Sequence, residues 1–479
     1  MLIKVFSLKK MKGMIAMLER LENLPVGNFH YKLLIVTGIG WLFDSMDTGL
    51  ISFVLPMLAK DWNLVPEQVG MIGSMGLFGM AIGAVMAGSL ADRFGRKNIF
   101  AATVILYSIA TGLCAVAWSY ESLLVFRFLV GFGLGGELPV AATLVSEYAP
   151  AHLRGRFIVL LESFWALGWL VAALLSYFFL PVFGWKAAFL LGSLPALYIF
   201  VIRLHMPESV RYLISKGRVD EAEEIVTNIE QQINLEFAKK MNMDFAISNT
   251  EESTIIIKKH EPSEKKEHLL KNITESHELS PVTLFNHQFR VRTIMLWLTW
   301  FGIVFSYYGI FMWLPSIVYA QGFEVVKSFQ YVLVMTLAQL PGYFTAAWLV
   351  DKVGRRYTLS SFLLMSGVCA FFFGNAATST QLLISGAAMS FFNLGAWGVI
   401  YTYTPELYPT HIRALGSGYA AGFGRIGGII APALVGSMIA SGFQFSIVFA
   451  LVASVFVAIS VVVLSLGLES KQMSLENIK

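Results

Sequence analysis

Six charged residues stand inside long apolar stretches of this sequence, where a charge is costly unless it is paired or functional. They are four carboxylates and two guanidinium groups: Asp44, Asp47, Glu137, Glu162, Arg127 and Arg425. An unpaired charge at the centre of a bilayer costs about 2.5–3.5 kcal/mol on insertion scales. A buried carboxyl group can bind and release a proton, and a guanidinium group can hold an anion in a bidentate fork. The six residues therefore indicate proton-binding and anion-binding chemistry inside a membrane.

The composition describes the elements that must carry these residues. Hydrophobic residues make up 56% of the 479 residues and charged residues only 14%. A soluble domain contains about 25% charged residues, so an ordinary water-soluble enzyme is excluded. Cys114 and Cys369 both lie in apolar runs and are too few for a disulfide scaffold. The chain is therefore expected to be a membrane protein.

Twelve apolar runs are long enough to cross a bilayer, for which a helix needs roughly 20 residues. The runs are continuous and do not alternate, so they predict helices instead of barrel strands. They lie near residues 33–58, 68–90, 98–118, 122–145, 157–180, 185–205, 291–319, 328–350, 357–375, 381–403, 413–439 and 443–467. The predicted fold class is an all-α membrane protein with twelve transmembrane helices in two six-helix bundles.

The distribution of charge predicts the topology. With a cytoplasmic N-terminus, the four short inner loops contain nine Lys or Arg and the six outer loops contain three. The positive-inside rule then places both termini and a long central loop in the cytoplasm of a cell (plasma) membrane protein. The predicted division is a cytoplasmic N-terminal segment 1–31, a bundle 32–206, a cytoplasmic loop 207–289, a second bundle 290–468 and a cytoplasmic tail 469–479.

Two sets of residues recur at a constant spacing of 259 residues. Asp92, Gly95 and Arg96 recur as Asp351, Gly354 and Arg355, and Glu147, Pro150 and Arg154 recur as Glu406, Pro409 and Arg413. One shared offset for both sets indicates a duplicated transporter whose halves are related by an axis along the membrane normal. The binding site is then expected between the halves, near the bilayer midplane.

Several motifs resemble a known transporter family. Residues 88–97 (GSLADRFGRK) resemble the signature loop of the major facilitator superfamily, and Arg127 with the following glycines resembles its fourth-helix pattern. Residues 207–211 resemble the segment after helix six of proton-coupled sugar porters. Residues 40–47, 135–139, 161–166 and 391–398 resemble bacterial niacin (nicotinate) transporters. The polar stretch at about 235–280 departs from that pattern as an insertion, expected to be disordered or a short helix.

The resemblance implies a proton-coupling group. Asp47 and Arg127 match an aspartate of helix one and an arginine of helix four that pair in sugar porters. Because the charge of a buried carboxyl depends on a nearby cation, separating the pair would couple proton release to transport. A static structural ion pair is the alternative. Asp44 shares a helix face with Asp47, a pairing that also resembles aromatic-acid/proton symporters. Glu137 is a second candidate proton site, or a carboxylate bonded to the glycine-rich backbone.

The resemblance also implies substrate-binding residues. Glu162 falls where sugar porters have a glutamine, Tyr307 and Tyr308 lie where they have a glutamine pair, and Trp397 matches their pocket tryptophan. Aromatic residues and one carboxylate thus replace polar amides, which favours a flat aromatic ligand. Trp165 lies on the same face as Glu162, and Asn393 completes the predicted set. Core packing or a membrane-interface belt is the alternative for the aromatic residues.

Arg425 is the predicted cation for a substrate carboxylate. It lies 12 residues beyond Arg413 and hence about 18 Å into its span at 1.5 Å per residue. Glycines at 422, 424, 427 and 428 surround it and permit close helix approach. The alternative is an arginine bonded to helix-end carbonyl groups.

The repeated charged motifs predict a gate at the inner ends of the bundles. Ion pairs that form when the inner ends touch, and break when they part, would make a bistable element that favours the outward-facing state. The alternative is that these charges only mark topology. The predicted gating residues are Asp92, Arg93, Gly95, Arg96, Glu147, Arg154, Asp351, Arg355, Glu406 and Arg413.

Together these features predict a secondary active transporter that imports a small aromatic carboxylate, first of all nicotinate, by proton symport with alternating access. The alternatives are a sugar, polyol or other organic-acid proton symporter and a transport-inactive receptor of the same fold. The sequence shows no nucleophile–base set, metal-ligand cluster or phosphate loop, so neither an enzyme nor a cofactor or metal is predicted. Expected partners are the substrate, protons and the lipid bilayer, without nucleic acid, and the chain is expected to be a monomer.

Overall fold

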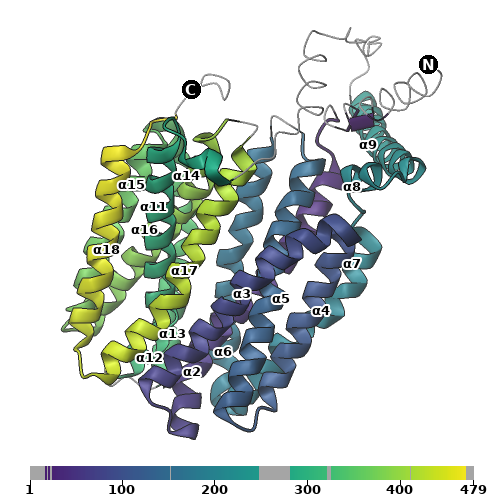
Figure 1. Ribbon diagram of the computed structural model, residues 1–479. Coiled ribbons are helices and arrows are strands. Elements are labelled where there is room, and N and C mark those ends of the chain that lie inside the picture. Colours follow the sequence, from purple (N-terminus) through teal and green to yellow (C-terminus); the bar gives the residue numbers. More distant parts are fainter. Residues whose placement is uncertain are drawn as a thin grey trace.

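The computed structural model describes residues 14, 17, 18, 20, 21, 24–150, 153–247, 281–320, 325–409 and 412–470. Helices make up nearly all of this part of the chain, and no strand occurs in it. They form two bundles that stand side by side, with both termini at the same end (Figure 1). The predicted all-helical membrane fold is therefore confirmed.

The first bundle contains the N-terminal spans. Its elements are α2 (Asn28–Trp62), α3 (Pro66–Phe94), α4 (Arg96–Ala115), α5 (Tyr120–Tyr148), α6 (Arg154–Gly192), η1 (Leu194–Tyr198) and α7 (Ile199–His205). Two helices follow the bundle at the end that carries the termini: α8 (Val210–Ser215) and α9 (Val219–Ile247). Helix α9 thus occupies the beginning of the predicted insertion, whose remainder lies outside the described residues.

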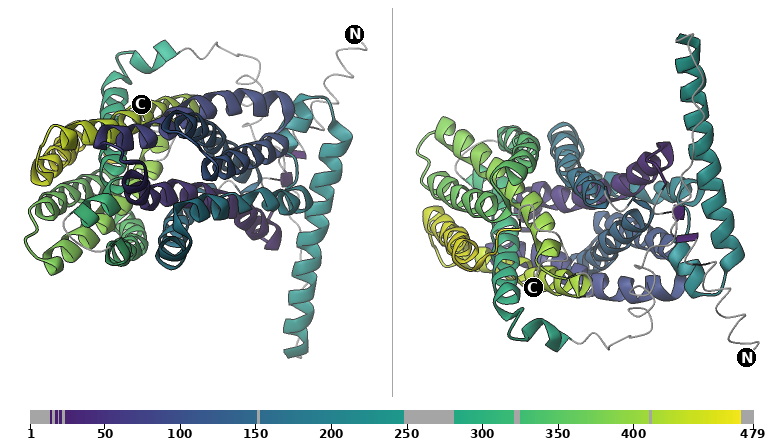
Figure 2. Two further views of the ribbon diagram at one scale, coloured as in Figure 1. Left: turned by 90° about the horizontal axis from the view of Figure 1, so that it is seen from below. Right: turned by 90° about the horizontal axis from the view of Figure 1, so that it is seen from above.

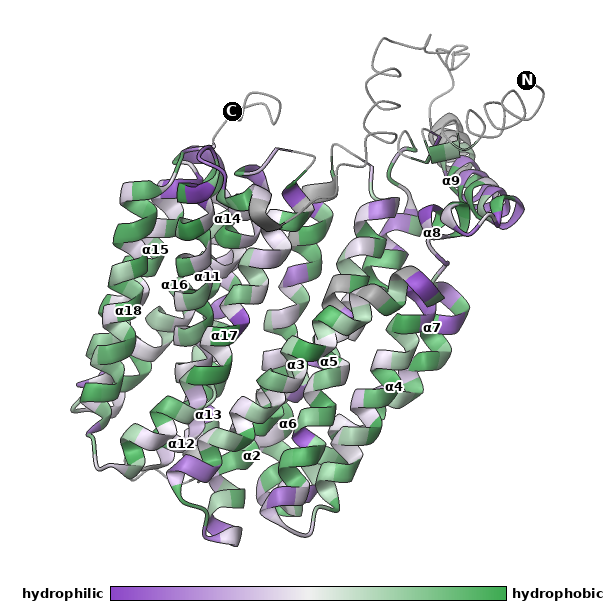
Figure 3. Cartoon of the chain, viewed as in Figure 1, coloured by the Kyte–Doolittle hydropathy of each residue, from purple (hydrophilic) through white to green (hydrophobic). Residues whose placement is uncertain are grey.

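The second bundle contains the C-terminal spans. Its elements are η2 (Pro281–Phe285), α11 (Arg290–Phe311), α12 (Leu314–Ala320), α13 (Val325–Leu337), α14 (Gln339–Lys352), α15 (Arg355–Gly374), α16 (Ser379–Glu406), α17 (Arg413–Ala440) and α18 (Phe445–Leu466). Hydrophobic residues run along the bundles, whereas hydrophilic residues gather at the end that carries the termini and on α9 (Figure 3).

Eleven helical stretches of the described residues are apolar and long enough to cross a membrane. The fifth, Arg156–His205, has 50 residues, which would extend about 75 Å as one straight helix at 1.5 Å per residue. Gly184 breaks it with φ 72° and ψ 177°, a conformation that glycine adopts without steric cost. The two predicted spans at 157–180 and 185–205 are therefore joined at a sharp turn in this stretch.

Glycines bring α3 and α5 into backbone contact within the first bundle. A Cβ on Gly131 would overlap the carbonyl oxygen of Gly76, and a Cβ on Gly135 would overlap that of Met80. Small residues allow such close approach between membrane helices. This packing explains the glycine pattern after Arg127 and fixes that arginine against α3.

The two bundles meet mainly at the end away from the termini. There the backbone N–H of Ala433 donates a 3.1 Å hydrogen bond to Ser74 Oγ, and the rings of Phe53 and Phe329 are 5.4 Å apart. Toward the termini, Gly88 on α3 and Gly418 on α17 have no neighbouring atom of the described chain within 4 Å of an added Cβ. The bundles therefore part toward the end that carries the termini (Figure 1).

Candidate functional site

The structure brings Asp47 and Arg127 together as an ion pair between α2 and α5. Arg127 Nη1 lies 3.1 Å from Asp47 Oδ2, and the hydroxyl of Thr111 on α4 donates a 2.8 Å hydrogen bond to Asp47 Oδ1. Asp47 is 2% exposed and Arg127 3% exposed. The negative charge of Asp47 is thus balanced by a guanidinium group and satisfied by a hydroxyl in a buried site.

Asp44 and Glu137 form a second acidic group nearby, one helical turn from Asp47. Their carboxyl groups lie side by side, and both residues are almost completely buried. No donor in the described chain hydrogen-bonds to any of their four carboxyl oxygens. A Cβ on Gly40 would overlap Glu137 Oε1, so the glycine of α2 creates the space for this carboxyl group.

An aromatic cluster crosses the boundary between the bundles. The indole N–H of Trp165 on α6 donates a 3.0 Å hydrogen bond to Tyr307 Oη on α11. The Tyr307 ring lies 5.1 Å from Tyr308 and 5.5 Å from Trp397, in edge-to-face geometry. The structure therefore brings together four of the predicted substrate-binding residues.

Arg425 on α17 reaches toward the first bundle at the edge of this cluster. Its Nη1 lies 2.7 Å from the thioether sulfur of Met80 on α3, and its side chain hydrogen-bonds Tyr308. Glu162 and Asp44 lie near enough to interact electrostatically with it, but no carboxylate of the described chain is within ion-pair distance. A thioether is a weak acceptor, so Arg425 keeps donors for an anion.

Asn393 is the predicted substrate residue that makes no hydrogen bond within the described chain. It is completely buried on α16, and neither its amide nitrogen nor its amide oxygen has a hydrogen-bond partner there. It stands one helical turn before Trp397 on the same helix, so its amide stays a candidate substrate contact.

Three aromatic residues of the cluster were not predicted. The Trp41 ring lies 4.7 Å from that of Trp165, and Trp300 lies 5.8 Å from Trp397 and 5.0 Å from Tyr401. In the sequence, these residues are indistinguishable from the many aromatic residues that pack membrane helices. Trp41 is the exception, because its position one turn before Asp44 could have suggested that it belongs to the site.

The predicted gating residues gather at the terminus-bearing end of each bundle. Arg96 Nε lies 4.0 Å from Glu147 in the first bundle. In the second, Arg355 Nε lies 2.9 Å from Glu406 and its Nη1 3.9 Å from Asp351. These ion pairs stay within their own half, which agrees with the separation of the bundles at this end.

The remaining gating residues have separate roles or fall outside the described atoms. Arg93 is exposed beside the Phe94 ring, and Arg413 Nε donates a 3.0 Å hydrogen bond to the carbonyl oxygen of Pro405. The side chains of Asp92 and Arg154 are not among those described.

Two glutamates outside the predicted set lie at these charged ends, one in each bundle. Glu208 Oε1 accepts hydrogen bonds from the backbone N–H groups of Arg96 at 2.8 Å and Lys97 at 3.2 Å. Glu469 accepts the equivalent hydrogen bonds from the backbone N–H groups of Arg355 at 2.9 Å, with Oε1, and of Arg356 at 3.2 Å, with Oε2. Each carboxylate caps the N-terminus of a membrane helix, where negative charge is favourable.

These caps depend on a glycine before each helix. Gly95 has φ 98° and Gly354 has φ 110°, and a Cβ on either would overlap the capping carboxylate. Ser209 and Ser470, next to the two glutamates, hydrogen-bond to Glu147 and Glu406 respectively. The ends of the two bundles are thus built alike.

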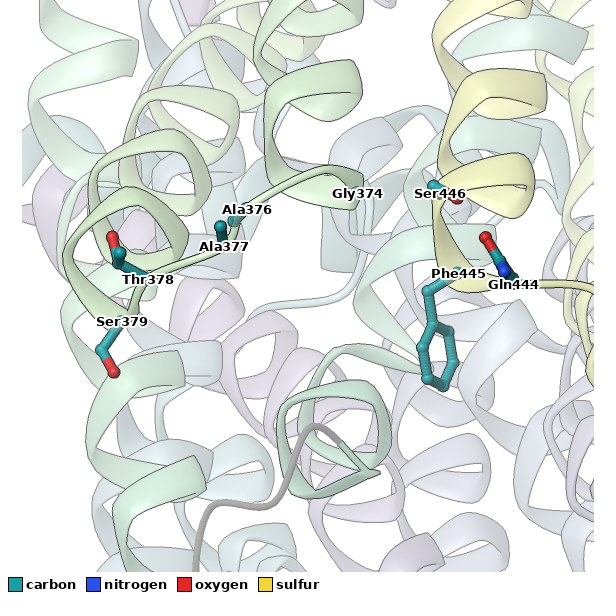
Figure 4. Close-up of a pocket in the computed structure, with 8 residues that line it drawn as sticks. All are labelled: Gly374, Ala376, Ala377, Thr378, Ser379, Gln444, Phe445 and Ser446. Atoms are coloured by element: carbon teal, nitrogen blue, oxygen red, sulfur yellow. The ribbon is translucent and has the colours of Figure 1, made fainter.

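A hollow of about 440 Å³ lies at the opposite end of the second bundle (Figure 4). It is lined by the loop Gly374–Ser379 and by Gln444, Phe445 and Ser446. It contains no charged side chain among its lining residues and lies at the first residues of α16 and α18, away from Arg425. It is therefore separate from the candidate site.

Sequence comparison decides the family. The family described as "Sugar (and other) transporter" matches residues 34–479. The chain belongs to this transporter family. It is 52% identical to the niacin transporter NiaP of Acinetobacter baylyi over 462 residues, which covers 96% of this chain and 99% of that protein. It is 45% identical to the putative niacin/nicotinamide transporter NiaP of Bacillus subtilis, with 93% and 98% covered.

Solved structures agree on the fold. The xylose transporter XylE from E. coli, in a partially occluded inward-open conformation, matches with a TM-score of 0.69 and 16% sequence identity. The match covers 94% of this chain and 100% of that one. The chain is therefore a multi-pass membrane transporter with the fold of this family, in which α2–α7 and α11–α18 form the two halves.

Proposed function

We propose that this protein imports nicotinate across the plasma membrane by symport with protons. The relative from Acinetobacter baylyi, 52% identical over nearly the whole chain, is named a niacin transporter, which supports the substrate. Both termini are assigned to the cytoplasm by the positive-inside rule, so the structure represents an inward-facing state. The functional unit is proposed to be a monomer, since each chain contains both halves.

Arg425 is the observation that carries this proposal. Its guanidinium group is held by Met80 and Tyr308, and it has no carboxylate of the described chain within ion-pair distance. An arginine in a membrane interior is costly without a partner, and a substrate carboxylate supplies that partner through charge-assisted hydrogen bonds. The ring of the same substrate is proposed to pack against Tyr308 or Trp397.

Proton coupling is assigned to the acidic group of the first bundle. Asp47 and Arg127 are within 3.1 Å, and Asp44 and Glu137 lie beside them on α2 and α5. All four side chains are almost fully excluded from water, which makes their charge state sensitive to movement of the helices. The cytoplasmic ion pairs around Arg96 and Arg355 are proposed to stabilise the inner gate.

Uptake into proteoliposomes tests the proposal. Purified protein is reconstituted, and accumulation of labelled nicotinate is measured with and without an imposed inward proton gradient. Accumulation that requires the gradient and is abolished by a protonophore supports nicotinate–proton symport. Binding without accumulation would instead show a receptor, and accumulation of xylose or glucose in place of nicotinate would show a sugar symporter.

A further inference from the structure

Asp44 and Glu137 stand in a site that two ionised carboxylates cannot share. Asp44 is 1% exposed and Glu137 is 0% exposed. None of their four carboxyl oxygens accepts a hydrogen bond from another group of the described chain. Two adjacent negative charges in such a dry site repel each other strongly, and neither receives the hydrogen bonds that would compensate for lost hydration. A proton shared between the two groups removes one charge and supplies the missing hydrogen bond.

The neighbouring Asp47 does not have this problem. Its charge is balanced by Arg127 at 3.1 Å, and Thr111 donates a hydrogen bond to its other oxygen. Two acids one helical turn apart on α2 thus have different environments. Asp47 has a counter-charge and a hydrogen-bond donor, whereas Asp44 and Glu137 have neither and can satisfy each other by sharing a proton.

A glycine on α2 leaves room for the carboxyl groups of Asp44 and Glu137 to lie side by side. A Cβ on Gly40 would overlap Glu137 Oε1, so any larger residue at this position would push the Glu137 carboxyl group away. Glu137 lies on α5, and α5 is fixed against α3 through the backbone contacts of Gly131 and Gly135. The adjacency of the two carboxyl groups is therefore a consequence of helix packing around glycines.

Other charged and titratable groups surround the pair at longer range. Those close enough to interact electrostatically are Asp47 on α2, Tyr107 on α4, Tyr198 on η1, Tyr308 on α11 and Arg425 on α17. Tyr107 is fully buried, and its hydroxyl has no hydrogen-bond partner in the described chain. Arg425 is the cation among these groups, and it belongs to the opposite bundle.

We propose that Asp44 and Glu137 share one proton throughout the cycle and together bind the co-transported proton as a second one, and that an anion on Arg425 strengthens the binding of that second proton. This inference rests on the proposed function, since it takes the carboxylate of nicotinate as the anion. While Arg425 is unoccupied, the single negative charge that the pair keeps is balanced by the positive charge of Arg425. A bound carboxylate cancels that charge, so the neutral form of the pair becomes more favourable. By reciprocity, a protonated pair increases the affinity of Arg425 for the anion.

The linkage gives this site a function that the Asp47–Arg127 pair does not supply. The proton on the first bundle and the anion on the second are bound favourably only together. When the proton and the anion are both bound, their charges cancel, so they add no net charge to the carrier. When both have been released, the carrier returns with the positive charge of Arg425 again near Asp44. Symport then follows from electrostatic coupling between the halves.

Infrared spectroscopy and calorimetry of the purified protein test the proposal. Wild type is compared with the double variant Asp44→Asn/Glu137→Gln, which keeps both shapes, and with Asp61→Asn, a matched control at the outer end of the same helix. At neutral pH and without ligand, wild type and Asp61→Asn are expected to show a buried carboxylic-acid carbonyl band that the double variant lacks. An equal band in the double variant would overturn the proposal, whether or not nicotinate binds.

The linkage is measured in the same samples. The dissociation constant for nicotinate in wild type and Asp61→Asn is expected to rise with pH, by about tenfold per pH unit at most for one linked proton. The double variant is expected to bind nicotinate with a dissociation constant that does not change with pH. Wild-type pH dependence in the double variant would overturn the assignment. A wild type that shows the acid band but binds no nicotinate would contradict the proposed substrate and not the proton-binding pair.

Gly40→Ala provides a variant that keeps both carboxyl groups. Its Cβ would displace Glu137, so the acid band and the pH dependence are expected to change together. Gly49→Ala is the control for Gly40→Ala. It adds a Cβ to the same helix, α2, where this atom would contact Ala172 on α6. A Gly40→Ala protein with wild-type band and pH dependence would show that the adjacency of the two groups is not required.

Discussion

Trp165 donates a 3.0 Å hydrogen bond to the hydroxyl oxygen of Tyr307, and this bond joins the two bundles at the candidate site. Trp165 is 9% exposed and Tyr307 1% exposed, so water does not readily replace either partner. A transporter that alternates its halves around a fixed site has to keep, break or remake such a bond in each cycle. The bond is therefore both a structural contact and a candidate control point for the transport cycle.

Removing one partner of this bond is expected to lower the free energy of unfolding more than removing both partners. Tyr307→Phe leaves the buried indole N–H unpaired, at a cost of about 1–3 kcal/mol in the free energy of unfolding. Trp165→Phe leaves the tyrosine hydroxyl unpaired in the same way. The measurement is detergent-solubilised unfolding of wild type, both single variants and the double variant. Additive losses in the double variant would show that the two residues do not stabilise each other.

The two bundles and their membrane-spanning helices could be predicted from the sequence because hydrophobicity dictates which segments enter a membrane. The charges inside those segments marked Asp47, Arg127 and Arg425 for the same reason, since an intramembrane charge stands out against apolar neighbours. The structure places Asp47 and Arg127 in one ion pair. Their transport role remains a proposal.

The aromatic contacts could not be predicted to the same extent. Trp41 and Trp300 look like packing residues in an apolar helix, and only the crossing of helices decides which rings meet. Asn393 is a polar residue in an apolar span, and the structure buries its amide group without a hydrogen-bond partner in the described chain, so its role in substrate binding stays a prediction. Helix periodicity predicts which residues share one face of a helix, but it does not predict which other helix packs against that face.

The capping glutamates were not predicted because their spacing along the chain differs slightly from that of the repeated charged motifs. The charged motifs repeat at a spacing of 259 residues, whereas Glu208 and Glu469 are separated by 261. A search at one constant offset misses them, although they occupy the same position relative to Arg96 and Arg355. Loops can change length between repeats while the helices that they cap stay equivalent.

Asp47→Asn is expected to separate coupling from translocation. The amide keeps the size of the carboxyl group but leaves the Arg127 charge unbalanced in a buried site. Proton-driven accumulation of nicotinate should fall sharply, while exchange of internal for external nicotinate partly survives. The measurement is uptake and counterflow in the same proteoliposomes. Full accumulation against a gradient would remove Asp47 from the coupling group.

Glu406→Gln is expected to weaken the inner gate of the second half. It removes the charged partner of Arg355 at 2.9 Å, and Glu147→Gln is the equivalent change in the first half. Each pair lies within its own half in this inward-facing structure, so its proposed effect on the gate is to hold the charged ends in the shape in which they meet when the gate closes. Its loss should disfavour closure and shift the population toward inward-facing states. Alkylation of a cysteine at Tyr419, which is 42% exposed here, reports this shift, and the two native cysteines are buried. Unchanged alkylation and transport would reduce these charges to topology markers.

Arg20→Ala is expected to release the N-terminal segment from α9. Arg20 lies 2.5 Å from both Glu223 and Glu230, and these hydrogen bonds, that to Glu230 first, raise the pKa of the guanidinium above its ordinary value. The described residues of this segment lie beside α9, which extends along the terminus-bearing face (Figure 2). Limited proteolysis should cut the variant faster near residue 20, as high salt should do for wild type. Equal cleavage rates would show that apolar contacts alone hold the segment.

The role of Arg425 is tested most directly by competition between nicotinate and nicotinamide for uptake of labelled nicotinate. The two compounds share a ring, but only nicotinate has a charge for the guanidinium group to bind, and charge-assisted hydrogen bonds are about twice as strong as neutral ones. Wild type should therefore prefer nicotinate. Arg425→Lys keeps a positive charge but loses the planar fork, so inhibition by nicotinate should weaken more than inhibition by nicotinamide. A wild type that prefers the amide, or a variant that loses both equally, would contradict the assignment of the carboxylate site to Arg425.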